Sequence, residues 1–430
     1  MDTNGLEKHF YFFRMRILWY TNTPCLYKQN NAYNGGGWLS SLQALLMKRS
    51  EIELGIAFSL EGEKEKVVEN GVTYYPLSMP KFSIKEKMQF IFCKENCVVM
   101  GERKRFTRYE ETIRKPLEDF EPDVIMVFGS EMPFGLVASL TDIPVILHIQ
   151  GVLNPCFNAF LPPFVSWSVF SKSTRGIKEK IHKIITRKLW LVSCEREKEI
   201  FRRVKNYFGR TDWDYRISQV MHPNANYFYS SEALRPIFYE FKERKLPKKL
   251  LIITTISSPL YKGYDLVLKT ATMLKSNGVD FSWKCYGNID PFMVEKYLGI
   301  NHKDVNVQLC GVASSEELRD ALCCATVYVH TSYIDNSPNS LCEAQLLGCT
   351  PIATNVGGIP SLIKNGETGY LIPANDPYQL TFLLKDLFLH PEKNLVMGLA
   401  AREIAKKRHN QNTIVNKLIN DLYNVICQQK

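Results

Sequence analysis

Short apolar segments, rich in Val, Ile, Leu and Phe, alternate with longer amphipathic stretches along the whole chain. This alternation is typical of parallel strands joined by helical crossovers. In the first half we expect strands at Arg16–Tyr20, Glu53–Phe58, Val72–Pro76, Val124–Phe128, Val145–Ile149 and Leu189–Cys194. A second series starts after the charged, proline-bearing stretch Phe241–Lys249, and we expect its strands at Leu250–Thr255, Phe281–Tyr286, Val305–Leu309, Val327–His330, Pro351–Thr354 and Tyr370–Ile372.

The two series predict an α/β protein of two Rossmann-like domains, residues 1–243 and 244–409, that face each other across a cleft. A chain of 430 residues is also too long for one ordinary hydrophobic core. The final stretch has a helical pattern that is polar on one side. It predicts a helix over about 410–430 that packs back on the first domain.

The formal net charge of +10 favours anionic partners such as nucleotide phosphates or anionic lipids. No nucleic-acid-binding motif accompanies the charge, so we expect no nucleic acid partner. The twelve cysteines lack metal-ligand spacing, which indicates reduced thiols in a cytosolic protein. The most apolar stretch, Phe157–Phe170, is interrupted by two prolines and is too short to span a bilayer. With no leader-like N-terminus, the sequence predicts a cytoplasmic protein.

Candidate chemistry begins with Asp335 and Glu343, which follow the expected strand Val327–His330. The carboxyl edge of a parallel sheet is where ligands of open α/β folds bind. A helix starting near Asn339 would offer the free amides of Asn339 and Ser340 to a diphosphate. The two carboxylates are suited to accept hydrogen bonds from sugar and ribose hydroxyls. An ordinary helix start with acidic residues has the same local pattern, and both interpretations stand at this point.

The residues that follow add a tight turn, a buried strand, a Gly-Gly loop and the run Asn365-Gly-Glu-Thr-Gly-Tyr-Leu-Ile-Pro. The whole stretch from Tyr328 to Pro373 resembles the donor site of family 4 glycosyltransferases, which are retaining enzymes of GT-B architecture. The resemblance implies that Asp335, where the family usually has Glu, holds hydroxyls of the transferred sugar. It implies that Glu343 holds the ribose hydroxyls, and that the amides of Asn339 and Ser340 bind the phosphates.

A second match is the run Thr254-Thr-Ile-Ser-Ser-Pro-Leu-Tyr-Lys-Gly-Tyr-Asp. It resembles the family's loop in which an Arg and, five residues later, a Lys-Gly pair neutralise the leaving diphosphate. Lys262 and Gly263 fit this pattern, whereas Ser257 stands at the position of the Arg. The alternative for Lys262 is an ordinary solvated loop lysine.

In the first domain, the glycine cluster that contains Gly36 and Gly37 follows the first strand and opens a helix. Glycines there let backbone approach a ligand closely, and the position fits the family's first glycine loop beside the donor diphosphate. His148 ends a buried strand, and one interpretation is a core histidine. The other comes from the resemblance to enzymes of bacterial capsule and exopolysaccharide assembly, in which a histidine at this strand end points at the donor sugar. The segment Gly209–Asp214 also resembles that subgroup; Asp212 and Asp214 are either helix caps or acceptor ligands.

The basic stretch Lys172–Lys188 is either a solvated helix face or a patch that attaches the protein to anionic lipid on the inner face of the membrane. We expect no metal, because cationic side chains and a helix N-terminus would take up the leaving-group charge. We expect no cofactor other than a nucleotide diphosphate-sugar as co-substrate.

The resemblance therefore implies a retaining hexosyltransferase, with UDP-sugar expected before GDP-sugar as donor. The second domain, residues 244–409, would bind the donor, and the first, residues 1–243, the acceptor. The acceptor would be a glycan or lipid-linked saccharide in surface polysaccharide synthesis, such as capsule. A GT-B epimerase or phosphorylase, and a non-catalytic nucleotide-sugar-binding or scaffolding protein, are the alternatives.

Overall fold

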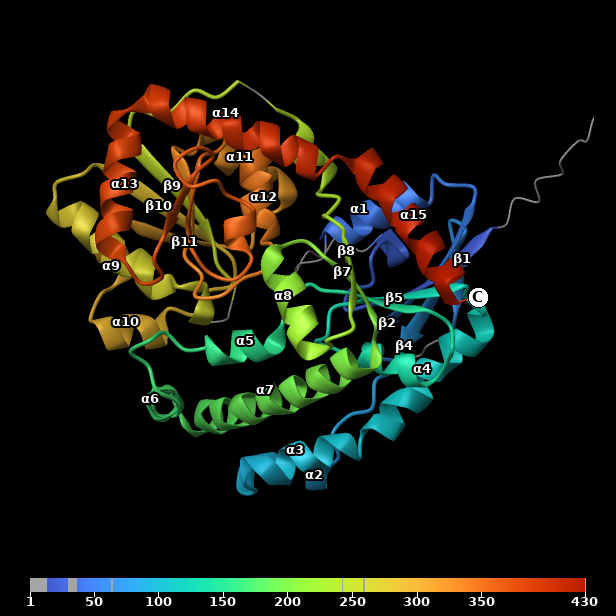
Figure 1. The fold of residues 1–430 in the computed structure, drawn as a ribbon. Coiled ribbons are helices and arrows are strands. Elements are labelled where there is room, and N and C mark those ends of the chain that lie inside the picture. The colour runs from blue at the N-terminus through green and yellow to red at the C-terminus, as the bar shows by residue number, and fades with distance from the viewer. Residues whose placement is uncertain (1–13, 30–36, 63–64, 242, 258–259, 430) are drawn as a thin grey trace, which may run out of the picture.

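The computed structural model describes residues 14–29, 37–62, 65–241, 243–257 and 260–429. They form two α/β domains side by side, each with one sheet that has helices on both faces (Figure 1). The predicted fold of two Rossmann-like domains is confirmed.

The sheet of the first domain has the strand order β3-β4-β2-β1-β5-β6-β7-β8. All neighbours are parallel except β3 and β4, and the order reverses between β1 and β5. The strands are β1 (Met15–Thr21), β2 (Ile52–Ser59), β3 (Val67–Glu69), β4 (Val72–Leu77), β5 (Val124–Phe128), β6 (Val145–His148), β7 (Asn206–Gly209) and β8 (Asn226–Tyr229).

The sheet of the second domain is parallel throughout, with the order β11-β10-β9-β12-β13-β14. Its order reverses between β9 and β12. The strands are β9 (Leu250–Thr255), β10 (Phe281–Tyr286), β11 (Val307–Gly311), β12 (Val327–His330), β13 (Pro351–Thr354) and β14 (Tyr370–Ile372). The expected strand at Val305–Leu309 is thus shifted by two residues, because a short 3-10 helix, η5 (His302–Val305), takes up its beginning.

Helices α1 (Gly37–Leu46) and α15 (Gln411–Gln429) cover one face of the first sheet, where Leu42 and Leu422 share one core. The C-terminal helix therefore packs on the first domain, to which it returns from α14 (Figure 1). The opposite face packs against α4 and the end of α7. The other helices of this domain are α2 (Ile84–Phe92), α3 (Glu95–Arg103), α4 (Phe106–Phe120), α5 (Leu153–Asn158), α6 (Trp167–Lys172), α7 (Ile177–Arg203) and α8 (Asp212–Met221).

In the second domain, α9, α10 and α13 cover one face of the sheet, and α11, α12 and α14 cover the other. Their bounds are α9 (Tyr264–Ser276), α10 (Phe292–Leu298), α11 (Ser315–Cys324), α12 (Asn339–Leu346), α13 (Pro377–Leu389) and α14 (Pro391–Arg408). Leu234 and Phe238 already belong to the core beneath α11 and α12. The chain thus enters the second domain before the boundary expected at residue 243.

The predicted strand Leu189–Cys194 is wrong, because these residues form the middle of helix α7. Their apolar run looks like a buried strand, but it is continuous with helical patterns on both sides. Val192 and Leu189 pack with Phe90 and Val98, so helices α2 and α3 of the same domain bury this part of α7. The run is apolar because it lies between layers of helices, and periodicity alone does not separate that case from a strand.

The apolar stretch Phe157–Phe170 lies in the first half of the chain and packs against the second domain. Phe160, Val165 and Phe170 belong to the core of the second domain, and the ring of Phe164 stacks on Tyr297 at 5.0 Å. This segment therefore makes an interdomain contact.

Candidate active site

A cavity of about 580 Å³ lies between the domains, at the carboxyl ends of β9 and β12. This is where the strand order of the second sheet reverses, the position at which open α/β sheets bind ligands. The first domain contributes Gly37 and Trp38. The other lining residues come from the second domain and the segment that enters it: Arg235, Thr255, Ile256, Ser257, Lys262, Tyr286, Gly287, Asn288, Val312, Ala313, Leu318, His330, Asp335, Pro338, Asn339, Ser340 and Glu343.

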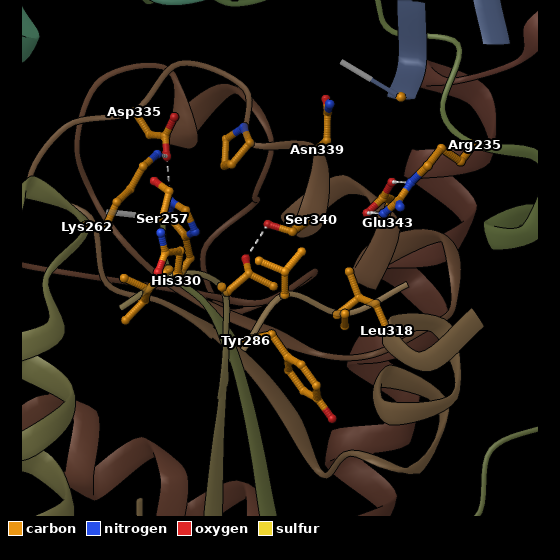
Figure 2. Close-up of a pocket in the computed structure, with 18 of the residues that line it drawn as sticks. Arg235, Ser257, Lys262, Tyr286, Leu318, His330, Asp335, Asn339, Ser340 and Glu343 are labelled. Atoms are coloured by element: carbon orange, nitrogen blue, oxygen red, sulfur yellow. Dashed lines mark hydrogen bonds and ion pairs between the residues drawn. The ribbon is translucent and has the colours of Figure 1, made fainter. Parts of the chain in front are cut away.

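One end of the cavity holds the ion pair between Lys262 Nζ and Asp335 Oδ2, at 2.6 Å (Figure 2). The same oxygen lies 2.9 Å from Nε2 of His330, the last residue of β12. Burial favours the neutral form of Asp335, but Lys262 and the His330 hydrogen bond outweigh it and hold the pKa of the carboxyl well below its usual range. Asp335 is therefore ionised at neutral pH.

Gly263 brings the two loops that carry this pair into contact. Its φ is +75°, and a Cβ atom there would come within 2.0 Å of the carbonyl oxygen of Thr331. The hydroxyl of Thr331 in turn donates to the carbonyl of Lys262 at 2.7 Å. Only glycine fits so close a backbone approach in the left-handed region, so Gly263 acts by positioning Lys262 beside Asp335.

The opposite end of the cavity holds a second ion pair, in which Arg235 donates two parallel hydrogen bonds to Glu343, each 2.8 Å long (Figure 2). Arg235 also donates to the hydroxyl of Ser315 at 2.8 Å. Burial raises the pKa of Glu343, and the bidentate arginine opposes that rise. An ionised carboxylate has about four acceptor positions, so Glu343 retains capacity for ligand hydroxyls while bound to Arg235.

The start of helix α12 lies between the two ion pairs. The hydroxyl of Ser340 is 2.7 Å from those of both Thr255 and Tyr328. Asn339 and Ser340 occupy the first turn, where helix amides lack acceptors within the helix. Tyr286, Val312, Ala313 and Leu318 also line the cavity and make part of its wall apolar; Figure 2 shows Tyr286 and Leu318 below Ser340 and Glu343. Ser257 is exposed and lines the cavity, so the position where the resemblance expects an arginine does face it.

Of the two glycines expected in the first domain, Gly37 begins α1 and lines the cavity, whereas Gly36 lies outside the described residues. His148 ends β6, is buried, and does not line this cavity in the described part of the chain. Its ring packs against Trp38, at 5.1 Å, and stacks on Phe128. Burial, followed by the positive charge of Arg210, lowers the pKa of His148 to about 3, so the ring is neutral. These contacts are those of a core histidine beneath Trp38.

The segment Gly209–Asp214 connects the domains. Thr211 and Asp214 form a capping box at the start of α8, and both bind Asn336, the neighbour of Asp335, at 2.7 and 2.8 Å. The amide of Asp212 donates to the hydroxyl of Ser361 at 3.1 Å. Asp212 and Asp214 have the Asp-x-Asp spacing of some metal sites, but Asp214 is fully buried and used by these structural hydrogen bonds. The segment therefore holds the Asp335 loop against the first domain.

Within the described residues, no group of three or more His, Cys, Asp or Glu side chains is arranged to hold a metal ion. In the same part of the chain, no helix is both long and apolar enough to cross a bilayer.

Sequence reasoning did not select Arg235, His330 or Trp38. His330 was visible as the last residue of a strand beside Asp335. Arg235 lies 108 positions from its partner, and no local spacing connects them. Trp38 directly follows the glycine cluster, a position that signals proximity to a ligand.

Residues 238–404 match the family described as glycosyl transferases group 1. A colanic acid biosynthesis glycosyltransferase of Salmonella typhimurium, WcaL, is 26% identical over 186 residues. That match covers 40% of this chain and 44% of the relative, so less than half of either protein is aligned.

Two solved structures share the whole architecture. Sucrose-phosphate synthase from Thermosynechococcus elongatus has a TM-score of 0.70 at 13% identity and covers 97% of this chain and all of its own. HepE from Anabaena in complex with UDP and glucose has a TM-score of 0.62 at 12% identity, covering 95% of this chain and all of its own. The two-domain fold is thus the GT-B fold of glycosyltransferases. Within it, residues 238–404 are the part that matches the group 1 glycosyltransferases.

Proposed function

We propose that the protein is a retaining glycosyltransferase that moves a hexosyl residue from a UDP-sugar to a saccharide or lipid-linked saccharide in surface polysaccharide synthesis. The observation that carries this proposal is the order of groups along the cavity. The pair Lys262–Asp335 and the pair Arg235–Glu343 lie on opposite sides of the cavity with the first turn of α12 between them, and the apolar wall with Leu318 lies on the side of Glu343 (Figure 2). A nucleotide diphosphate-sugar has its sugar, diphosphate, ribose and base in the same order.

Each group suits the part of the donor that it would meet. Asp335 would accept hydrogen bonds from hydroxyls of the transferred sugar, and Glu343 from those of the ribose. The amides of Asn339 and Ser340 would bind the diphosphate, as helix N-termini bind anions. UDP is favoured over GDP by the resemblance to enzymes of capsule assembly; the UDP and glucose bound by HepE are compatible with this choice.

The reaction would break the bond between the anomeric carbon and the diphosphate and form a bond from that carbon to an acceptor oxygen. The nucleoside diphosphate leaves with the bonding electrons, and the acceptor hydroxyl loses its proton. Lys262 would stabilise the negative charge that grows on the leaving oxygen, which is the larger part of catalysis in such transfers.

A non-catalytic nucleotide-sugar-binding protein would use the same cavity without turnover. Thermal shift with UDP-, GDP- and dTDP-sugars, followed by a UDP-release assay with the donor that binds best, separates the two. We expect one UDP-sugar to raise the melting temperature and to be consumed faster with the protein than without it. Binding without any release of nucleotide, in the presence of a mixed glycan acceptor pool, would favour the non-catalytic alternative.

We also propose that the first domain attaches to anionic membranes, through a surface that differs from the one expected from sequence. Within the basic stretch, Lys188 is buried and donates to the carbonyl of Cys93, while Arg187 pairs with Glu95. These residues support helix packing. Lys178 and Lys180, at the start of α7, are exposed.

Helix α2 adds a second group of exposed side chains. Ile84, Met88 and Phe92 are 82, 48 and 74% exposed and, at spacings of four, lie on one side of the helix. Lys85 and Lys87 are exposed on the same helix, whereas its acid, Glu86, pairs with Arg105 and Arg108. An apolar stripe beside exposed lysines, on a helix whose one acid is paired with arginines, is suited to an anionic lipid surface.

Co-sedimentation with vesicles of phosphatidylglycerol tests this surface. Each exposed lysine near an anionic surface contributes about 1 kcal/mol to the free energy of membrane binding. We therefore expect a triple variant with Glu in place of Lys85, Lys87 and Lys180 to lose binding at low salt. The matched control is a triple variant with Glu in place of three exposed lysines of the second domain, Lys364, Lys406 and Lys407. Equal binding of both triple variants, or no binding of the wild type, would contradict the proposed membrane attachment.

A further inference from the structure

His330 lines the large cavity, and the proposed function gives it no role. It is the last residue of β12, at the point where the strand order of the second sheet reverses, and it pairs with Ala353 of β13. Only 3% of the residue is exposed. The imidazole is therefore held by an interior strand of the sheet, whereas Asp335 belongs to the loop that follows this strand.

The ring donates a hydrogen bond to the Asp335 carboxylate. Its Nε2 lies 2.9 Å from Oδ2 of Asp335. Because Asp335 is ionised and an ionised carboxylate only accepts hydrogen bonds, the nitrogen that faces it carries the hydrogen. On the other side of the ring, Nδ1 lies 3.5 Å from the hydroxyl of Tyr328, two residues earlier on the same strand. The strand thus presents one defined donor to Asp335.

The two oxygens of the Asp335 carboxylate are bound very differently. Among the residues that the structure describes, Oδ1 accepts only from the amide of Asn336, at 3.0 Å. The donors on Oδ2 are Lys262 at 2.6 Å, His330 at 2.9 Å and Ser332 at 3.3 Å. Each carboxylate oxygen has about two acceptor positions. Oδ1 therefore keeps one position open for a hydroxyl of a sugar, and Oδ2 anchors the group.

Loss of Lys262 from Asp335 would leave two donors on Oδ2, as many as its acceptor positions. Of these two, the imidazole is the nearer, and it is fixed by a strand. Burial favours the neutral form of a carboxyl, and a hydrogen bond to the charged form opposes this. Without the imidazole, a buried Asp335 that has lost its cation would keep only the Ser332 contact on Oδ2.

We propose that His330 is a positioning residue for the donor sugar. It holds Oδ2 of Asp335 in place, so that Oδ1 stays available to a sugar hydroxyl while Lys262 binds the diphosphate. The inference rests on the proposed function, which assigns the sugar to Asp335 and the ribose to Glu343. Loss of the imidazole should therefore weaken binding of the sugar part of the donor and leave binding of the nucleotide part unchanged.

Isothermal titration with UDP, UDP-glucose, UDP-galactose and UDP-N-acetylglucosamine measures the two parts separately. The quantity compared is the affinity for the UDP-sugar that wild type binds most tightly, divided by the affinity for UDP. His330→Leu keeps an apolar side chain at the buried position but removes the donor. We expect this ratio to fall by about ten-fold or more, because a hydrogen bond to a charged group is lost. The affinity for UDP should stay close to that of wild type.

Two amide variants distinguish a directed hydrogen bond from a packing role. In His330→Gln the amide nitrogen reaches the place of Nε2, whereas in His330→Asn it reaches only that of Nδ1. Both side chains are polar and differ by one methylene group. We expect the ratio of His330→Gln to lie near that of wild type and the ratio of His330→Asn to lie near that of the leucine variant.

His390→Asn is the matched control, since this histidine is 61% exposed beside α14 and does not line the cavity. Both of its affinities should equal those of wild type. Equal ratios in His330→Gln and His330→Asn would overturn the role of His330, and this comparison also decides the question if the leucine variant does not fold. So would an equal loss of affinity for UDP and for the UDP-sugar in every His330 variant, which indicates a packing defect. Failure of wild type to bind UDP and all three UDP-sugars would contradict the proposed function and the role of His330 together.

Discussion

The two ion pairs of the large cavity differ in how firmly each is held. Lys262 reaches Asp335 through one contact, and the same carboxylate oxygen also has His330 at 2.9 Å and Ser332 at 3.3 Å. Arg235 holds both oxygens of Glu343 and is itself tied to Ser315. A lysine is a point charge on a flexible stem, whereas the arginine fork is planar and directional.

This difference indicates different tasks for the two ends. If Lys262 moved to a diphosphate, Asp335 would keep His330 and Ser332 as partners. If Arg235 moved, Glu343 would lose both of its bonds at once. We therefore infer that Lys262 exchanges between Asp335 and the donor, and that Arg235 stays in place and orients Glu343.

The largest effect is expected for Lys262→Ala. Charge on the leaving diphosphate grows toward the transition state, so the loss should fall on kcat more than on donor binding. Removal of one such stabilising group typically costs about 10²- to 10³-fold in kcat. Steady-state kinetics with the preferred UDP-sugar measures it, with the exposed Lys303→Ala as control. An unchanged kcat would assign the leaving-group charge to another residue.

For Glu343→Ala the loss should appear in donor affinity instead. Two ribose hydroxyls lose a charged acceptor, for a cost in binding free energy of about 2–3 kcal/mol. Isothermal titration with UDP measures the change. Wild-type affinity for UDP in this variant would mean that Glu343 does not meet the ribose.

A smaller effect is expected on the pH dependence of UDP affinity, which should differ between variants of the two ion pairs. In Arg235→Ala the burial of Glu343 acts unopposed, so the pKa of its carboxyl rises. A raised pKa means that the neutral form gains population as pH falls, so UDP affinity of this variant should fall more steeply from pH 8 to pH 6 than that of wild type. In Lys262→Ala, His330 still faces Asp335, and no such decline is expected. Parallel pH profiles for the two variants would contradict the contrast between the pairs.

The smallest effect is expected for Ser257→Arg, which restores the cation that the family resemblance expects. The position is exposed and lines the cavity, so an added charge near the diphosphate should improve UDP affinity by about 1 kcal/mol or less. Titration at low and high salt checks it, because a gain from an exposed charge fades with screening. A gain that does not depend on salt would come from something other than that charge.

Much of this arrangement could be predicted from the sequence, for a physical reason. Lys262, Asp335 and Glu343 follow two strands that are neighbours in a parallel sheet, so local spacing along the chain becomes proximity in space. The same logic fails for Arg235, whose position depends on how the chain crosses between domains. Strands β7 and β8 were missed because Asn206–Gly209 and Asn226–Tyr229 are short and only partly apolar.

The burial and contacts of the basic stretch and of His148 could not be predicted from the local sequence either. Whether a lysine faces water depends on the helices that pack against it, and Lys188 is buried because α2 ends beside it. His148 lies below Trp38 rather than in the cavity. Both outcomes are set by tertiary packing, which acts across long separations in sequence.

The most direct test of the account is a crystal structure with a non-hydrolysable UDP-sugar. We predict Lys262 Nζ within hydrogen-bond distance of the diphosphate and no longer on Asp335, whose carboxylate holds sugar hydroxyls. The bidentate pair of Arg235 and Glu343 should be unchanged, with the ribose on Glu343. A bound donor with the Lys262–Asp335 pair intact and the Arg235–Glu343 pair broken would contradict the account.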